Sequence, residues 1–162
     1  MFGKLLLLLL TLLFLFSCGR EYTCAELLSR MLRVSGGGSE NGLLYVAEAV
    51  EGDVGYLSRE NADLLYGEGA YGAYFSLLED FSLFISAREP QELAVFKCRS
   101  ASDCEAVAQM CLRRADSIKI ALRGTAYEER AKGISVEIHG RAVVFYFTEE
   151  SRRVACEIND LL

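Results

Sequence analysis

Apolar and polar residues follow two different periods along the second half of the chain. Four segments have the alternating or continuous apolar pattern of β-strands: 81–86, 92–98, 134–139 and 142–148. Each pair of strands is followed by apolar residues at helical spacing, within 104–118 and 154–161. We therefore predict an α+β fold of repeated ββα units that form a four-stranded, largely antiparallel sheet with helices on one face.

The segment from residue 18 to residue 66 predicts shorter elements. Residues 23–26 (TCAE) have the form of a helix capping box, and apolar residues at helical spacing follow until the glycines at 36–38 break the pattern. This helix either packs on the rest of the protein or forms a stalk. Ser58 is a candidate N-cap for a short helix that ends at Tyr66, whereas 43–50 fits a strand or a helix.

A different pattern occupies the start of the chain, where the nearly unbroken apolar run 5–16 follows a single cation, Lys4. A membrane-spanning helix needs about 20 apolar residues, so this run is too short. A core helix would show a polar face, which a run made mostly of leucine lacks. A basic residue, an apolar run of about 7–15 residues and a small residue after it form a secretory signal peptide, which we assign to residues 1–17.

The end of this run resembles a bacterial lipobox, in which a leucine stands three places before an acceptor cysteine and a small residue directly precedes it. Leu15, Ser17 and Cys18 fill these places, while Phe16 is larger than the usual residue. We predict that Cys18 is acylated and that its lipid anchors the protein to the extracytoplasmic face of the cell membrane. The alternative is an ordinary secretory signal with a coincidental cysteine.

Length and charge bound the remaining possibilities. Cleavage would leave 145 of the 162 residues, enough for one domain. We divide them into an anchor, first helix and glycine-rich linker over 18–40 and a single α+β domain over 41–162. Cleavage would also remove one cation and change the formal net charge from −6 to −7. This acidic balance argues against nucleic acid and against electrostatic attachment to anionic lipid, so the acyl group is the expected anchor.

Five cysteines remain besides Cys18: Cys24, Cys98, Cys104, Cys111 and Cys156. An odd number leaves at least one thiol unpaired within the chain. No CxxC motif occurs and the spacings match no zinc site, so we expect no metal. Cys104 and Cys111 fall on the apolar face of a predicted helix, which favours buried free thiols over a disulfide framework. Pairing of Cys98 with a helix cysteine stays open.

No motif in the sequence predicts catalysis or a cofactor. Residues 67–72 (GEGAYG) have the glycine spacing of a dinucleotide-binding loop, but they follow a predicted helix instead of a strand. His139, the only histidine, lies at a predicted turn, and nothing nearby in sequence supports a dyad with Cys98 or Cys156. Adjacent carboxylates such as residues 79–80 point apart and are poor acid–base partners.

Three tyrosines accompany the glycines of this loop: Tyr66, Tyr71 and Tyr74. Tyrosine offers a large contact area at a modest loss of conformational entropy, so the three form a possible binding surface for a ligand or partner. Packing in the core is the alternative, and it is the expected role of the neighbouring Phe75.

Several segments match a known family. They are the lipobox, residues 63–67 (DLLYG), residues 92–97 (ELAVFK), the arginine-rich helix after them and the closing strand 142–147. With these features the chain from about residue 57 onward resembles a family of small bacterial lipoproteins, mainly from anaerobic Gram-positive bacteria, known as the domain of unknown function number forty-three fifty-eight. Gly69 and Gly72 depart from its usual pattern. The family has no established activity, so the resemblance implies no catalytic residues.

Together these observations predict a non-enzymatic, lipid-anchored surface protein that binds a small molecule or a protein near the membrane. An envelope enzyme with an unrecognised thiol or carboxylate site is the alternative, and a purely structural stalk is a third. A deep pocket that gathers His139 with a cysteine or with two carboxylates would favour the enzyme. An exposed aromatic patch at residues 66–74 would favour binding.

Overall fold

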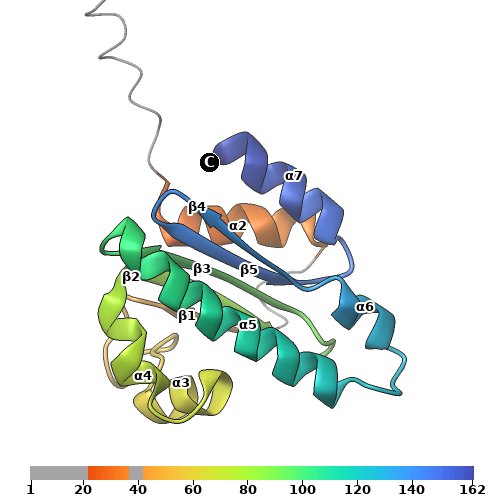
Figure 1. Ribbon diagram of the computed structural model, residues 1–162, viewed down its shortest axis with the longest axis horizontal. Helices are drawn as coiled ribbons and strands as arrows, with labels where there is room; N and C mark the ends of the chain where they lie inside the picture. Colours follow the sequence, from red (N-terminus) through yellow and green to blue (C-terminus); the bar gives the residue numbers. More distant parts are fainter. Residues whose placement is uncertain (1–21, 37–41) are drawn as a thin grey trace, which may run out of the picture.

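The computed structural model describes residues 22–36 and 42–162. Within them, one antiparallel sheet forms the central layer, with the spatial strand order β1-β2-β3-β5-β4 (Figure 1). The strands are β1 (Gly42–Val46), β2 (Leu78–Ser86), β3 (Glu92–Cys98), β4 (Ser135–His139) and β5 (Ala142–Phe147). The predicted α+β class and antiparallel pairing are confirmed. The prediction of four strands is wrong, because the ambiguous segment after residue 42 begins with a fifth strand, β1.

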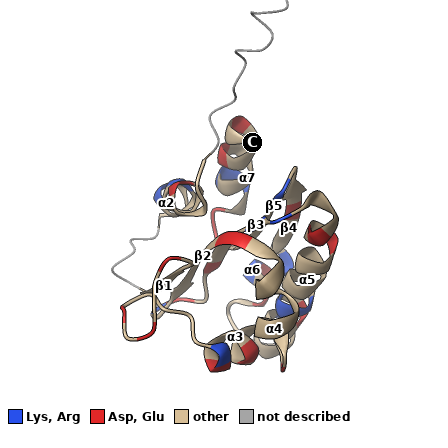
Figure 2. Ribbon diagram, turned by 90° about the vertical axis from the view of Figure 1, so that its left-hand side faces the viewer, with Lys and Arg blue, Asp and Glu red and all other residues tan. Residues whose placement is uncertain are grey.

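Helices cover both faces of this sheet. They are α2 (Cys24–Val34), α3 (Arg59–Tyr66), α4 (Ala70–Ala73), α5 (Cys104–Ala121), α6 (Glu128–Lys132) and α7 (Ser151–Leu161), with short 3₁₀ turns at Phe75–Leu77 and Ala101–Asp103. Helices α2 and α7 pack on one face, and α5 with α3 and α4 packs on the other, as the turned view in Figure 2 also shows. The prediction that helices cover one face is therefore wrong.

Strand β3 shows how one sheet supports two cores. Successive side chains of a strand point to opposite faces. Leu93 and Val95 join the core under α2 and α7, whereas Ala94 and Phe96 join the core under α5. The structure does not confirm a ββα repeat: β2-β3-α5 and β4-β5-α7 share their order along the chain, but α5 and α7 lie on opposite faces of the sheet.

The first helix belongs to the folded unit. The Thr23 hydroxyl accepts a hydrogen bond from the Glu26 backbone N–H, and the Glu26 carboxylate accepts one from the Thr23 N–H, so the predicted capping box starts α2. Leu28 and Met31 are each 1% exposed and lie in the core above β3 and β5. Of the two alternatives for this helix, packing is the observed one, and the folded unit begins upstream of residue 41.

Candidate functional site

Two of the predicted binding tyrosines pack against a phenylalanine cluster. The Tyr66 ring is 5% exposed and lies 5.9 Å from the Phe75 ring and 6.0 Å from the Phe96 ring, between centroids. The Tyr71 ring stacks on Phe75 at 5.6 Å. Tyr66 therefore has the core role that the sequence left as an alternative, and Tyr71 covers that core from outside.

Tyr74 lies at a different place. Together with Tyr66, Arg113 and Arg114 it lines a hollow of about 360 Å³ beside α5, which Tyr71 does not reach. The Arg113 guanidinium lies 5.1 Å from the Tyr74 ring centroid and also donates a hydrogen bond to the Tyr74 hydroxyl. The three tyrosines thus do not share one patch, and their role as a binding surface stays a prediction.

A buried ion pair closes the inner side of this hollow. Arg114 of α5 donates from Nε and Nη2 to one Glu92 carboxylate oxygen, at 3.0 and 2.7 Å. Glu92 is 2% exposed, and this burial raises the pKa of its carboxyl group although Arg114 opposes the change. The Tyr66 hydroxyl is buried and lies near the same carboxylate. This arrangement fixes α5 to the sheet.

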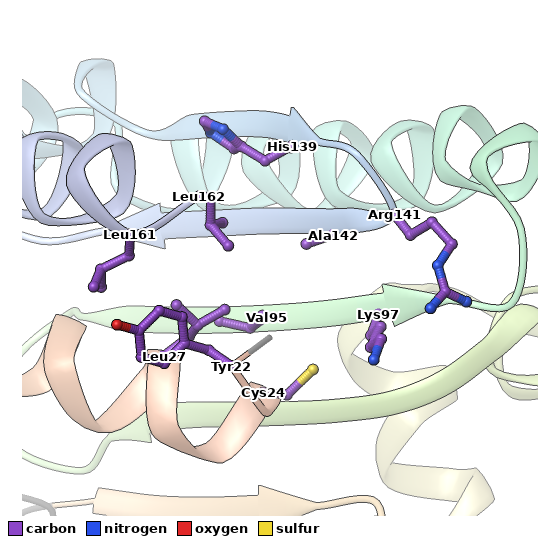
Figure 3. A pocket seen from close by; sticks show the side chains of 10 residues that line it. All are labelled: Tyr22, Cys24, Leu27, Val95, Lys97, His139, Arg141, Ala142, Leu161 and Leu162. Carbon is purple, nitrogen blue, oxygen red and sulfur yellow. The ribbon is translucent and has the colours of Figure 1, made fainter. Parts of the chain in front are cut away.

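A second hollow, of about 390 Å³, lies on the other face of the sheet (Figure 3). It forms where the start of α2, the end of α7 and the turn between β4 and β5 meet over β3. We call it the Lys97–Arg141 pocket. Its lining residues are Tyr22, Cys24, Leu27, Val95, Lys97, His139, Arg141, Ala142, Leu161 and Leu162. Sequence reasoning missed this pocket, because its residues come from four separate segments of the chain.

The pocket has an apolar half and a basic half. Figure 3 shows Leu27 and Leu161 at one end and the Lys97 and Arg141 side chains together at the other. Both cations contact Glu79, with Arg141 Nη1 at 2.8 Å and Lys97 Nζ at 3.3 Å from its carboxylate oxygens. The bonds from Arg141 and then Lys97 lower the pKa of Glu79. Glu79 itself stands outside the lining.

His139 lies in this pocket, but its ring is engaged elsewhere. Its Nε2 is 3.0 Å from Glu137 Oε2, and the Tyr146 hydroxyl donates to the other oxygen of Glu137. Cys98 points into the opposite core, and Cys156 does not line the pocket. The structure therefore brings neither of the two cysteines considered above to His139.

The thiol that shares the pocket with His139 is Cys24. Its pKa is raised well above the ordinary value, mainly by burial and further by the Asp80 carboxylate, which accepts a hydrogen bond from the Cys24 backbone N–H at 3.0 Å. All five described cysteines are free thiols, and Cys156 alone among them is exposed. The expectation of buried free thiols is thus confirmed for four of them.

The predicted acylation site, Cys18, and the predicted signal peptide lie outside the described residues. Within residues 22–36 and 42–162, no helix is long and apolar enough to cross a membrane. The same part of the chain contains no group of three or more His, Cys, Asp or Glu side chains placed to hold a metal ion.

No family model, curated protein or solved structure matches this chain. The resemblance to the lipoprotein family named above stays a prediction.

Proposed function

We propose that this protein is a lipid-anchored, extracytoplasmic binding protein, acylated at Cys18, whose Lys97–Arg141 pocket binds a small anionic amphiphile. The observation that carries the proposal is the composition of the lining. Lys97, Arg141 and His139 line the pocket, while none of the ten side chains that line it is a carboxylate. The other lining side chains are mainly apolar, so the site suits a ligand with one anionic group and a hydrocarbon portion.

The size of the pocket supports a ligand of moderate length. Small-molecule sites enclose about 300–1,000 Å³, and this pocket of about 390 Å³ falls near the lower limit. In the hollow beside Tyr74, Arg114 is paired with the buried carboxylate of Glu92, and Arg113 contacts Tyr74. Lys97 and Arg141 are also paired, but their partner Glu79 is 45% exposed, so a ligand anion can replace it without leaving a buried charge. The Lys97–Arg141 pocket is therefore the better candidate for an anion.

Calorimetric titration of the protein with dodecanoate tests this binding. A charge-assisted hydrogen bond contributes about 1.5–3 kcal/mol, so Lys97→Gln and Arg141→Gln should each raise Kd roughly tenfold or more. Lys119→Gln is the matched control, because Lys119 is an exposed lysine on α5, across the sheet. Unchanged affinity in both pocket variants, or equally tight binding of uncharged dodecanol, would disprove the proposed ligand class.

Metabolic labelling with a palmitate analogue tests the anchor. We expect the wild-type protein and the Cys24→Ala variant to carry the label and Cys18→Ala to lose it. Cys24→Ala is a close control, since it removes a cysteine six positions further along the chain. Label retained on Cys18→Ala would contradict acylation at this residue.

A thiol enzyme is the second candidate, because His139 and Cys24 line one pocket, the arrangement predicted above to favour an enzyme. Two observations oppose it. A cysteine nucleophile reacts as the thiolate, and burial raises the pKa of Cys24. The imidazole of His139 is directed to Glu137 and not to a thiol.

Alkylation of the native protein with iodoacetamide separates the two candidates. For a binding protein we expect exposed Cys156 to react first and buried Cys24 to react only as fast as the fold opens. Rapid modification of Cys24 that His139→Ala abolishes would favour the enzyme instead.

A further inference from the structure

Three ends of the fold meet at the mouth of the Lys97–Arg141 pocket. Tyr22 and Cys24 come from the start of α2, and Leu161 and Leu162 come from the end of α7. Figure 1 shows these two helix ends above the sheet, next to the β4–β5 turn, while α3 lies below the sheet, on its opposite face; the turned view in Figure 2 agrees. The chain therefore enters the described fold at the pocket itself.

The connection between the predicted anchor and this entry point is short. Four residue steps join Cys18 to Tyr22, and at about 3.3–3.6 Å each they reach no further than about 14 Å. The position of Tyr22 relative to the membrane rests on the proposed acylation of Cys18. An acyl group in the bilayer would then keep Tyr22, and the pocket that it lines, within that distance of the membrane surface.

The residues around the mouth have the composition of a membrane interface. Leu162 is 49% exposed, and Tyr22 and Leu161 are partly exposed. The Arg30 guanidinium lies 5.1 Å from the Tyr22 ring centroid, so a cation accompanies this aromatic ring. Aromatic rings with a polar tip, apolar side chains and long basic side chains are the groups that settle at the level of lipid headgroups.

We propose that the pocket-bearing end of the domain is a membrane-contacting face, and that the ligand is an anionic amphiphile taken up directly from the bilayer. The apolar half of the pocket receives the hydrocarbon chain as it leaves the lipid phase. Lys97 and Arg141 meet its anionic group. Such a route spares the hydrocarbon chain a passage through water, which is unfavourable for every CH₂ group that it exposes.

Tryptophan fluorescence on vesicles tests this orientation, because the chain contains no tryptophan. Leu162→Trp and Leu64→Trp would each be prepared as the acylated full-length protein and bound to phosphatidylcholine vesicles that carry brominated acyl chains. We expect strong quenching and a blue shift for Leu162→Trp. Leu64 is the matched control, since it is 82% exposed on α3, on the opposite face of the sheet, and its tryptophan should stay unquenched.

A transfer measurement tests the source of the ligand. Vesicles loaded with a fluorescent medium-chain carboxylate should pass it to the acylated protein on the same vesicles several-fold faster than to Cys18→Ser protein in solution. Equal transfer rates would overturn uptake from the bilayer.

The outcomes also distinguish this inference from the proposed function. A vesicle-bound protein that binds dodecanoate but shows no quenching of Leu162→Trp would overturn the membrane-contacting face and leave the binding function standing. A protein that neither carries acyl chains nor binds dodecanoate would refute the proposed function and this inference together.

Discussion

The two faces of the sheet hold carboxylates that differ in exposure and in pairing. On the α5 face, Glu92 is 2% exposed and receives two hydrogen bonds from the single guanidinium of Arg114 at one of its oxygens. On the α2 and α7 face, the Glu79 side chain is 45% exposed and is shared between Lys97 and Arg141 at the edge of a pocket. One carboxylate is closed inside the fold, and the other is open to water.

The difference indicates which face is built for stability and which for binding. A buried ion pair gains strong hydrogen bonds, while both of its charges lose their hydration. Removing one partner therefore leaves the other charge buried and uncompensated. A half-exposed carboxylate is screened by water and contributes little to stability, so another anion can compete for its cations at a small cost. We therefore place structural charge at Glu92 and ligand-directed charge at Lys97 and Arg141.

The largest effect should come from breaking the buried pair. Arg114→Ala leaves the Glu92 carboxylate without its partner, and we expect a loss of about 3–5 kcal/mol in the free energy of unfolding measured with urea. Arg113→Ala is the control from the neighbouring position on α5. Arg113 is exposed and contacts the Tyr74 ring and hydroxyl at the surface, so its removal should cost less than about 1 kcal/mol. Similar losses for both variants would remove the basis of the comparison.

Removing a helix N-cap on either face of the sheet should have a smaller effect on stability, and the two faces should then differ in ligand binding. Thr23 caps α2 beside the pocket, and Ser58 caps α3 on the opposite face of the sheet with the same kind of bond, from Asn61 N–H. Thr23→Ala and Ser58→Ala should each cost about 1 kcal/mol of stability. Only Thr23→Ala should also weaken dodecanoate binding, because it loosens the helix start that carries Tyr22 and Cys24. Equal loss of binding in both variants would contradict the placement of the pocket.

Much of the local structure was predictable from the sequence. The segment 92–98 forms a strand with those bounds, and the capping box at residues 23–26 starts a helix, because both patterns depend on near neighbours along the chain. The sequence of β3 also indicates that both faces of the sheet are covered. β3 reads ELAVFKC with apolar residues at successive positions, and such continuous runs are typical of strands buried on both sides.

The pocket was not predictable in the same way. Lys97 and Arg141 are 44 positions apart in the sequence, and only the pairing of β3 with β5, which sets Lys97 opposite Ala142, brings them together. That pairing joins the β2–β3 hairpin to the β4–β5 hairpin, and the alternating pattern within one hairpin does not predict which other strand pairs with it. The burial of Tyr66 was also not predictable from its neighbours. Its place beside glycines suggested a surface, but the phenylalanines that bury it come from elsewhere in the chain.

The smallest effect is a difference in sign between the pH dependences of the two carboxylates. Burial raises the pKa of Glu92, so between the ordinary carboxyl pKa of about 4.3 and this raised pKa the folded protein keeps a proton that the unfolded chain releases. Its contribution to stability therefore falls as the pH rises. Arg141 and Lys97 lower the pKa of Glu79, so its contribution is present above the ordinary pKa and is lost as the pH falls through the lowered one.

Urea unfolding of the wild type, Glu92→Gln and Glu79→Gln from about pH 3 to pH 8 measures this difference, since glutamine does not titrate. The stability of the wild type relative to Glu92→Gln should decrease with rising pH, and its stability relative to Glu79→Gln should increase. The second slope should be shallow and should flatten in high salt, because Glu79 is half exposed and its ion pairs are screened. A falling slope for Glu79 as well would show that its carboxylate is desolvated as that of Glu92 is, and would contradict the difference between the two faces.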